Sequence, residues 1–337
     1  MKILYLIKRH TFNHKMSRVR FDSIYALKRY LGNSLKISGP GYPDFKSARQ
    51  MELEYKPHII IWYKPLEMSE YDKVETPRCL RYNEMWDREW TSKEIRTSKS
   101  NLVICHHYND IGKYNDRLDP KQYKLVHNPH CAETRKYRDF EDGKTIDVLY
   151  IGQGSKKFYP LRKKLREKVL PMLANKGIRV KVYNHPGYKL KGLKKVNEQV
   201  ERYAWNISRA KIVVTCGSIY NYALAKYSEV PLCRTALCAN IPGENKEWFL
   251  KWMIPIDNNM SAAHIKDKII GYLRSPEELK EKTELGYHEN FFKRSQEEYA
   301  KRFIKMADDF LSGEMDDYDF TTDKQRYLNG GDGVYNS

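Results

Sequence analysis

The sequence predicts an α/β protein made of two successive doubly wound halves, each with helices flanking a parallel sheet. Three observations support this class: short apolar runs recur along the chain, longer amphipathic stretches separate them, and one polar segment divides the runs into two sets. The 337 residues have room for about two domains of ordinary size. A hydrophobic content of 41% and an aromatic content of 13% exclude a disordered polyelectrolyte.

The first half contains short apolar runs that predict buried strands. They are Lys2–Ile7, His58–Tyr63, Arg78–Tyr82, Asn101–His106 and Tyr123–His127. Apolar residues at helical spacing predict a helix over Ser17–Leu31, and Pro57 should end another helix before the second strand. Strands that alternate with amphipathic stretches are typical of βα units in a parallel sheet.

A second set of elements follows the polar segment Arg135–Lys144, which we interpret as a linker. Strands are expected at Ile146–Ile151, Ile178–Tyr183, Ala210–Thr215 and Thr235–Ala239. Helices are expected at Leu161–Leu173, Tyr220–Glu229, Ser261–Leu273, Pro276–Glu284 and Tyr287–Leu311. Pro171 should kink the first of these helices or end it early. The domains are therefore expected at residues 1–138 and 145–284, with 313–337 as an acidic, loosely ordered tail.

The chain is strongly basic, with 61 Lys and Arg residues against 43 Asp and Glu, a formal net charge of +18. Residues 1–50 carry a net charge of +9 and residues 144–200 one of +12, whereas residues 308–337 carry −6. Such segments predict an anionic partner. No homeodomain, zinc-finger or RRM pattern accompanies them, so a dedicated reader of DNA sequence is not expected. Electrostatic binding to DNA or to another acidic substrate stays open.

Sequence features also bear on the compartment. No apolar run approaches the roughly 20 residues that span a bilayer, and the apolar start of the chain is too short for a secretory signal. The six cysteines form no CxxC pair, which suits reduced thiols. We therefore expect a cytoplasmic protein (in the host cytoplasm if it is viral) without a transmembrane segment, and peripheral contact with a membrane stays open.

Two glycine-containing stretches could hold a nucleotide. The loop Gly152–Ser155 follows a predicted strand and leads toward a helix, so its backbone N–H groups could bind an anion. It is neither a full G-x-G-x-x-G motif nor a Walker A loop, and an ordinary strand-to-helix turn is the alternative. The stretch Gly217–Glu229 follows another predicted strand. Its Lys226 could neutralise a phosphate and its Glu229 could accept hydrogen bonds from a ribose, or the two could form a surface ion pair.

Three runs resemble motifs of the GT-B glycosyltransferases, most closely the group-1 family and its spore-maturation-protein-like branch. They are Lys226–Ile241, Ile146–Arg162 and the His-x-Pro stretch Val126–Cys131. The resemblance implies two Rossmann-like domains that face one another across a cleft. It also implies a C-terminal helix, at about residues 287–312, that crosses back and completes the first domain.

The resemblance further implies a glycosyltransferase, hexosyl or pentosyl, that needs no metal. It would move a sugar from a UDP- or GDP-sugar to an acceptor hydroxyl on a glycan, a protein or a lipid-linked sugar. Glu229 would hold the ribose, and Lys226 with the backbone of Gly152, Gly154 and Ser155 would hold the diphosphate. Arg162 lies near these groups in the motif, and Ser218 and Tyr222 complete the expected donor site.

Two positions depart from the family pattern. Many retaining members carry an acidic residue where this chain has Asn221, which puts a retaining mechanism in doubt. Position 234 is commonly Gly, and Arg234 is expected either to narrow the site or to add a phosphate contact.

The first half is expected to bind the acceptor. A basic loop with two histidines, Lys8–Lys15, follows the first strand, where it could bind an anionic acceptor or be a mobile turn. An inverting enzyme needs a base for the acceptor hydroxyl, because alcohols are poor nucleophiles. Asp110, His107 and Asp87 are the candidates in that order, although such residues at strand ends are more often structural.

Other interpretations stay open. One is a DNA-modifying glycosyltransferase that acts on a hydroxylated base, and another is a non-catalytic, nucleic-acid-binding relative of the fold. A metal site is not expected, because His106-His107 and His130-Cys131 lack the spacing of a closed zinc site. Asp317-Tyr-Asp319 fits the Asp-x-Asp pattern but follows no predicted strand, so we interpret it as chance.

Overall fold

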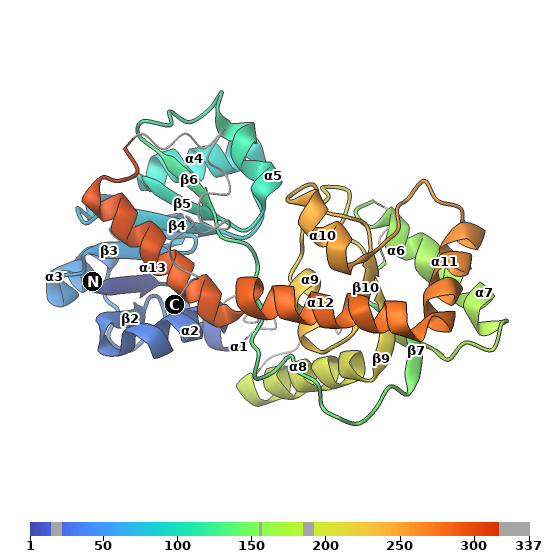
Figure 1. Ribbon diagram of the computed structural model, residues 1–337. Helices are drawn as coiled ribbons and strands as arrows, with labels where there is room; N and C mark the ends of the chain where they lie inside the picture. The colour runs from blue at the N-terminus through green and yellow to red at the C-terminus, as the bar shows by residue number, and fades with distance from the viewer. Residues whose placement is uncertain (15–21, 155–156, 185–191, 317–337) are drawn as a thin grey trace. The chain divides into compact units, whose positions relative to one another are not determined.

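The computed structural model describes residues 1–14, 22–154, 157–184 and 192–316, and the chain forms two compact units (Figure 1). The first unit comprises Met1–Pro129 and Gln296–Ser337, with Lys191–Leu193; the second comprises His130–Leu190 and Lys194–Ser295. The chain thus passes into the second unit at His130, ahead of the segment Arg135–Lys144 that we interpret as a linker. The predicted acidic tail, from residue 317 on, lies outside the described residues.

The first unit contains a six-stranded parallel sheet in the order β2-β1-β3-β4-β5-β6. Its strands are β1 (Ile3–Leu6), β2 (Leu35–Ser38), β3 (Ile59–Trp62), β4 (Arg78–Tyr82), β5 (Leu102–Cys105) and β6 (Lys124–His127). Its helices are α1 (Arg9–His14), α2 (Asp22–Leu31), α3 (Ala48–Tyr55), α4 (Arg88–Ser98), α5 (Tyr108–Ile111) and α13 (Gln296–Ser312). All residues of β1, β3, β5 and β6 are buried, as expected for a parallel sheet covered on both faces.

The second unit contains a five-stranded parallel sheet in the order β11-β10-β9-β7-β8. Its strands are β7 (Ile146–Ile151), β8 (Val180–Tyr183), β9 (Ala210–Val214), β10 (Ala236–Ala239) and β11 (Ile254–Pro255). Its helices are α6 (Pro160–Lys164), α7 (Leu170–Ala174), α8 (Leu193–Ser208), α9 (Lys226–Leu232), α10 (Lys246–Trp252), α11 (Ala262–Arg274) and α12 (Pro276–Arg294). Both sheets therefore reverse their strand order between the first and third strands of the unit, at β1/β3 and at β7/β9.

The C-terminal helices break at a different residue from the one predicted. One helix continues to Arg294 and the next begins at Gln296, whereas the predicted break lay between Glu284 and Tyr287. A Cβ at Gly286 would lie 3.2 Å from the Trp252 ring, so this glycine serves close packing against α10 and not helix termination.

Helix α13 belongs to the first unit, where it packs on α2 and lies against the sheet (Figure 1). Its buried Tyr299 accepts a hydrogen bond at Oη from Arg81 Nε at 3.2 Å. The same ring stacks on His106, with ring centroids 5.7 Å apart. The chain thus returns to its first unit after completing the second.

Pro171 does not end the helix in which it lies. Helix α6 continues through a π-helical turn, Leu165–Val169, into α7. Leu170 N donates to Leu165 O, a bond that spans five residues. Because proline lacks an N–H group, this wider turn just before Pro171 accommodates the missing hydrogen bond, and the predicted early end is wrong.

Candidate functional site

Two loops meet where the strand order of the second unit reverses, between β7 and β9. Open parallel sheets bind ligands at the carboxyl ends of the strands at such a point. Thr215 Oγ1 donates to Ile151 O at 3.2 Å and holds the two strand ends together. The loop after β7 contains Gly152 and the loop after β9 contains Gly217, so the two predicted glycine stretches lie at one place.

Arg162, near the start of α6, joins these two loops. Its side chain is buried, and Nη2 donates to Cys216 O at 2.6 Å while Nη1 lies 3.5 Å from Gln153 O. The guanidinium also lies 4.0 Å from the centre of the Tyr159 ring. Through these contacts Arg162 positions the two loops. Its direct contact with a diphosphate stays a prediction.

Gly152 lets the first loop lie on that guanidinium. Its φ of 106° is a conformation that favours glycine, and a Cβ there would lie 3.0 Å from Arg162 Nη1. Gly154 follows in the same loop, with the Tyr150 hydroxyl 3.5 Å from where its Cβ would be. Ser155 lies outside the described residues. Such a loop after a strand offers backbone N–H groups to an anion.

Gly217 is the tightest point of the second loop. A Cβ there would lie 2.2 Å from the backbone oxygen of Tyr222, and Tyr222 N donates to Gly217 O at 3.0 Å. Tyr222 itself is buried and stacks on Tyr220 with ring centroids 5.4 Å apart. Ser218 Oγ accepts a hydrogen bond from Tyr220 N at 3.2 Å, so both residues predicted beside the donor support the turn.

This turn corrects the helix predicted over Tyr220–Glu229. Ser218 has φ 74° and Asn221 φ 56°, left-handed conformations that a helix does not contain. Helix α9 begins only at Lys226. The loop therefore reaches further along the chain than its apolar pattern indicates.

Asn240, which directly follows β10, fixes the shape of this loop. Its Oδ1 accepts from Gly217 N at 2.7 Å, and its Nδ2 donates to Asn221 Oδ1 at 2.6 Å. Tyr227 Oη donates to Asn240 O at 2.8 Å. The sequence analysis missed Asn240, although its place just after the predicted strand Thr235–Ala239 was a usable signal.

Glu229 is a buried carboxylate between two tyrosines. Oε2 accepts from Tyr203 Oη at 3.1 Å and Oε1 from Tyr137 Oη at 3.3 Å. Burial raises the pKa of Glu229 above its usual range, while the charge of Lys226 and the two hydroxyls oppose that rise. Neither tyrosine was predicted, because Tyr137 lies in the segment interpreted as a linker and Tyr203 in a helix that we did not identify.

Lys226 lies on the same short helix, three residues before Glu229. Its Nζ is 5.7 Å from the centre of the Tyr203 ring. The structure thus brings together the two side chains expected to hold ribose and phosphate, at the end of the Gly217 loop.

Arg234 occupies a position at which the backbone favours glycine, with φ 48°. Its guanidinium forms an ion pair with Glu284 and lies 4.0 Å from the centre of the Tyr287 ring. The side chain is therefore engaged by α12, and its expected role in narrowing the site or in contacting a phosphate stays a prediction.

Asp110 of the first unit is buried on α5. Its Oδ2 accepts from Met85 N at 3.0 Å and its Oδ1 pairs with Lys113 Nζ at 2.9 Å. These contacts join the loop after β4 to the helix after β5. Asp110 therefore has a structural role in addition to any catalytic one.

The other two candidate bases lie nearby in the fold. His107 is buried directly before α5, and Asp87 directly precedes α4. Asp87 is exposed and caps α4, because its Oδ1 accepts from Trp90 N at 3.1 Å. A role for any of the three in removing a proton stays a prediction.

Part of the positive charge in residues 1–50 is paired within the first unit. Lys8 Nζ lies 2.6 Å from Glu67, Lys36 Nζ 3.0 Å from Asp44, and Arg49 Nη1 2.5 Å from Glu52. The first two pairs are partly exposed and contribute little stability, whereas Glu52 of the third is buried; all three lower the charge available to an anionic partner. Residues 15–21 of this basic segment lie outside the described residues.

Metal and membrane features were searched within residues 1–14, 22–154, 157–184 and 192–316. No cluster of three or more His, Cys, Asp or Glu side chains there could hold a metal ion. No helix there is both long and apolar enough to cross a bilayer. Asp317 and Asp319 lie outside these ranges.

Comparison with known proteins gives structural neighbours alone: no protein-family model and no curated protein sequence matches the chain. Sucrose-phosphate synthase from Thermosynechococcus elongatus superposes with a TM-score of 0.62 at 11% identity, covering 93% of this chain and 100% of that one. A glycosyltransferase from Rickettsia africae gives 0.58 at 12% identity, covering 92% and 98%. HepE from Anabaena, in complex with UDP-glucose, gives 0.57 at 9% identity, covering 93% and 100%.

The chain has the GT-B fold. Its two parallel α/β units match the architecture of these neighbours over nearly the whole chain, which confirms the predicted fold class. The narrower resemblance to the spore-maturation-protein-like branch stays a prediction. Within the GT-B fold, the loops at β7 and β9 lie at the carboxyl ends of the second sheet, where doubly wound sheets bind nucleotides.

Proposed function

We propose that the protein is a glycosyltransferase that moves a sugar from a nucleoside-diphosphate sugar to an acceptor hydroxyl. The observation that carries this proposal is the placement of Lys226 and Glu229 on one turn of α9, beside the two glycine loops. A carboxylate and an ammonium three residues apart match the ribose hydroxyls and the phosphates of one nucleotide.

The two tyrosines orient Glu229 for this role. Each carboxylate oxygen accepts one tyrosine hydroxyl and retains a further lone pair, with which it could accept a hydrogen bond from ribose. Raising the pKa of Glu229 through burial makes the carboxylate a strong acceptor once it is ionised. A buried carboxylate held in this way is expensive for stability, which favours a binding role over a surface ion pair.

The diphosphate would lie between Lys226 and the backbone of the Gly152 loop. Negative charge develops on the leaving diphosphate in the transition state, and positioned cations and N–H groups stabilise it. The Arg162 contacts hold these N–H groups in place before the donor binds, so little reorganisation is needed at the moment of reaction. HepE, a structural neighbour, is complexed with UDP-glucose, so UDP-sugars are the first donors to test and GDP-sugars the second.

We expect the acceptor to bind the first unit, at the carboxyl ends of its strands. A glycan, a protein or a lipid-linked sugar would supply the hydroxyl, and Asp110, His107 or Asp87 would accept its proton if the reaction inverts. DNA with a hydroxylated base is the alternative acceptor, and a steep salt dependence of duplex binding would support it.

The test is a screen of UDP- and GDP-sugars for hydrolysis or transfer by the full chain. Lys226→Met and Glu229→Gln should each lower kcat/KM at least about tenfold, because each removes a charged hydrogen bond to the donor. Lys195→Met, at an exposed lysine of α8, is the matched control and should match the wild type. Wild-type turnover by both donor-site variants would contradict the assignment.

A further inference from the structure

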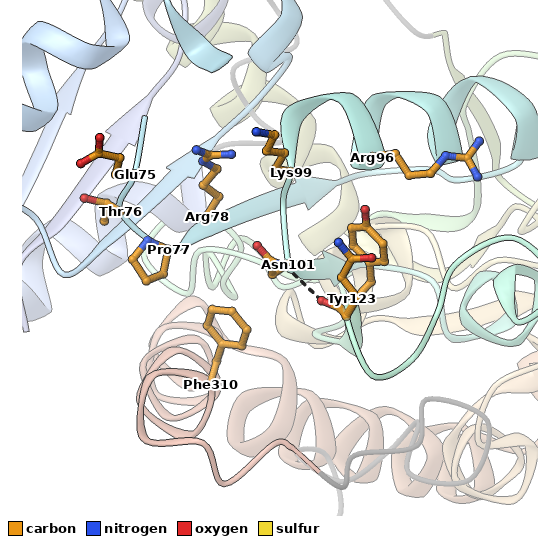
Figure 2. Close-up of a pocket in the computed structure, with 10 residues that line it drawn as sticks. Glu75, Thr76, Pro77, Arg78, Arg96, Lys99, Asn101, Tyr123 and Phe310 are labelled. Carbon is orange, nitrogen blue, oxygen red and sulfur yellow. Dashed lines mark hydrogen bonds between the residues drawn. The ribbon is translucent and has the colours of Figure 1, made fainter. Parts of the chain in front are cut away.

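The first unit has a pocket at the amino ends of β4, β5 and β6, of about 570 Å³ (Figure 2). It is lined by Glu75, Thr76, Pro77, Arg78, Arg96, Lys99, Asn101, Gln122, Tyr123 and Phe310. The candidate bases follow β4 and β5 at their carboxyl ends, so the pocket lies at the opposite edge of the sheet from them. This volume is in the range of small-molecule sites.

The lining is rich in cations without carboxylate partners. Arg78, Arg96 and Lys99 form no ion pair with any of the described residues. Arg78 Nη1 donates to Ser98 O at 3.3 Å, and Arg96 Nη1 donates to Arg117 O at 3.1 Å. A guanidinium that bonds one carbonyl still has N–H groups to offer a ligand.

Arg78 is the most informative of the three. It is only 7% exposed, and burial lowers its pKa from the usual value. The carboxylates of Glu52 and Asp72 oppose that shift, but neither forms an ion pair with Arg78. Glu52 pairs instead with Arg49 and accepts from the backbone N–H groups of Glu75 and Thr76, and a buried cation is further stabilised by an anion that pairs with it directly. The pocket therefore favours an anion that could reach the buried guanidinium.

The other lining residues indicate the chemistry of the ligand's organic part. Phe310 of α13 lies opposite Pro77 and Asn101, and Tyr123 contributes a second ring (Figure 2). Asn101 Nδ2 is held by Gln122 O at 3.1 Å, which leaves its Oδ1 for a hydroxyl or amide of the ligand.

We propose that this pocket binds a phosphate-bearing small molecule at a site separate from glycosyl transfer. The guanidinium fork of Arg78 suits the oxygens of a phosphate, and Lys99, whose ammonium lies on the same side of the view in Figure 2, adds a point charge. The Arg96 side chain extends away from these two, so it adds positive charge to the pocket without contacting the same phosphate. The organic part of the ligand lies against the Tyr123 and Phe310 rings.

The test is calorimetric titration of the full chain with inorganic phosphate and pyrophosphate at 0.15 M NaCl, roughly physiological ionic strength. All variants carry Lys226→Met, because the proposed donor site would also bind these probes. Adding Arg96→Gln and Lys99→Gln should raise the dissociation constant at least about tenfold, because one charged hydrogen bond and a further positive charge of the pocket are lost. Both side chains are exposed, so the fold should survive, and the melting temperature checks this.

Lys93→Gln is the matched control, at an exposed lysine of α4 outside the pocket lining. It should bind the probes within about twofold of its parent, because Lys93 is not among the residues that line the pocket. The proposal is overturned if the Arg96→Gln, Lys99→Gln protein binds as tightly as the Lys93→Gln protein, or if the parent binds neither probe. No sugar donor is used, so this outcome does not depend on whether the chain transfers sugars.

Discussion

The Arg162 guanidinium donates from Nη2 to the Cys216 carbonyl at 2.6 Å, and so joins the loop after β9 to a helix that follows β7. Ile219 N donates to Phe158 O at 3.0 Å and links the same two segments through the backbone. A buried side chain and a backbone hydrogen bond thus help to position the two loops before any ligand binds.

Replacing Arg162 should therefore disturb donor binding through loop position. Arg162→Lys keeps the charge but loses the planar fork, so we expect kcat/KM for the donor to fall at least about tenfold. Arg166→Lys, at an exposed position of the following π-helical turn, is the control. Equal kinetics for the two variants would show that the bridge to Cys216 does not matter for the donor.

Gly217 and Gly271 make a matched pair of glycines. Gly217→Ala would place Cβ 2.2 Å from Tyr222 O, so the loop must move, and we expect both lower donor turnover and a lower melting temperature. Gly271→Ala, in α11 with nothing within 4 Å, should stabilise the protein by about 1 kcal/mol and leave turnover unchanged. Kinetics and thermal unfolding of both variants check this. Wild-type turnover and melting temperature in Gly217→Ala would contradict the described loop.

Replacing Glu229 should lower donor turnover but raise the melting temperature relative to wild type as the pH increases. Its pKa is raised in the folded chain, so at pH above that value folding must bury a carboxylate, whereas below the unfolded value both states are protonated. The melting temperature of Glu229→Gln relative to wild type should therefore rise from pH 4.5 to pH 7.5, while donor turnover falls. A relative melting temperature that does not change with pH would mean that burial does not perturb this carboxyl.

The pKa of Lys144 is also shifted by burial, but the resulting pH dependence of stability has the opposite sign to that of Glu229. Burial lowers its pKa to about 8, and its Nζ donates to Ser208 O at 2.7 Å and Thr235 Oγ1 at 3.1 Å. Between pH 8 and pH 10.5 the unfolded chain binds the proton and the folded chain does not, so stability relative to Lys144→Met should rise with pH across this window. The total rise is at most about 3 kcal/mol, from 1.36 kcal/mol per pKa unit. Denaturant unfolding at pH 7.5, 9 and 10.5 measures it, and a flat difference contradicts it.

The ion pair of Arg234 with Glu284 predicts the effect of replacing this residue. Because its guanidinium is already engaged by Glu284 and Tyr287, Arg234→Gly should leave the donor KM unchanged. Glycine also relieves a left-handed backbone that costs about 1–2 kcal/mol for other residues, which offsets the lost ion pair. A several-fold rise in the donor KM would instead support the phosphate contact.

The strands were the most predictable part of the fold, because a parallel sheet buried on both faces needs continuous apolar runs. β2 was missed because Lys36 interrupts its four residues, and this strand lies at the sheet edge. The Gly217 loop was predicted as a helix because its alanines and tyrosines suit one. The turn depends on the close approach of Gly217 to Tyr222 O and on the hydrogen bonds from Asn240, which lies about twenty residues further along the chain. The composition of the loop by itself does not encode the contacts with Asn240.

The donor residues Lys226 and Glu229 could be predicted from motif spacing, but their surroundings could not. Tyr137 and Tyr203 reach Glu229 from segments distant in the chain, so the burial of that carboxylate depends on tertiary packing. The same holds for Asp110, whose bond from Met85 N joins loops after two different strands.

The most direct test of the account is donor turnover by the wild type, Lys226→Met and Lys195→Met under identical conditions. The account predicts that the wild type and Lys195→Met consume at least one UDP- or GDP-sugar, and that Lys226→Met loses at least about tenfold in kcat/KM, the loss expected for one charged hydrogen bond. Unchanged turnover by a folded Lys226→Met protein would contradict the placement of the donor at α9.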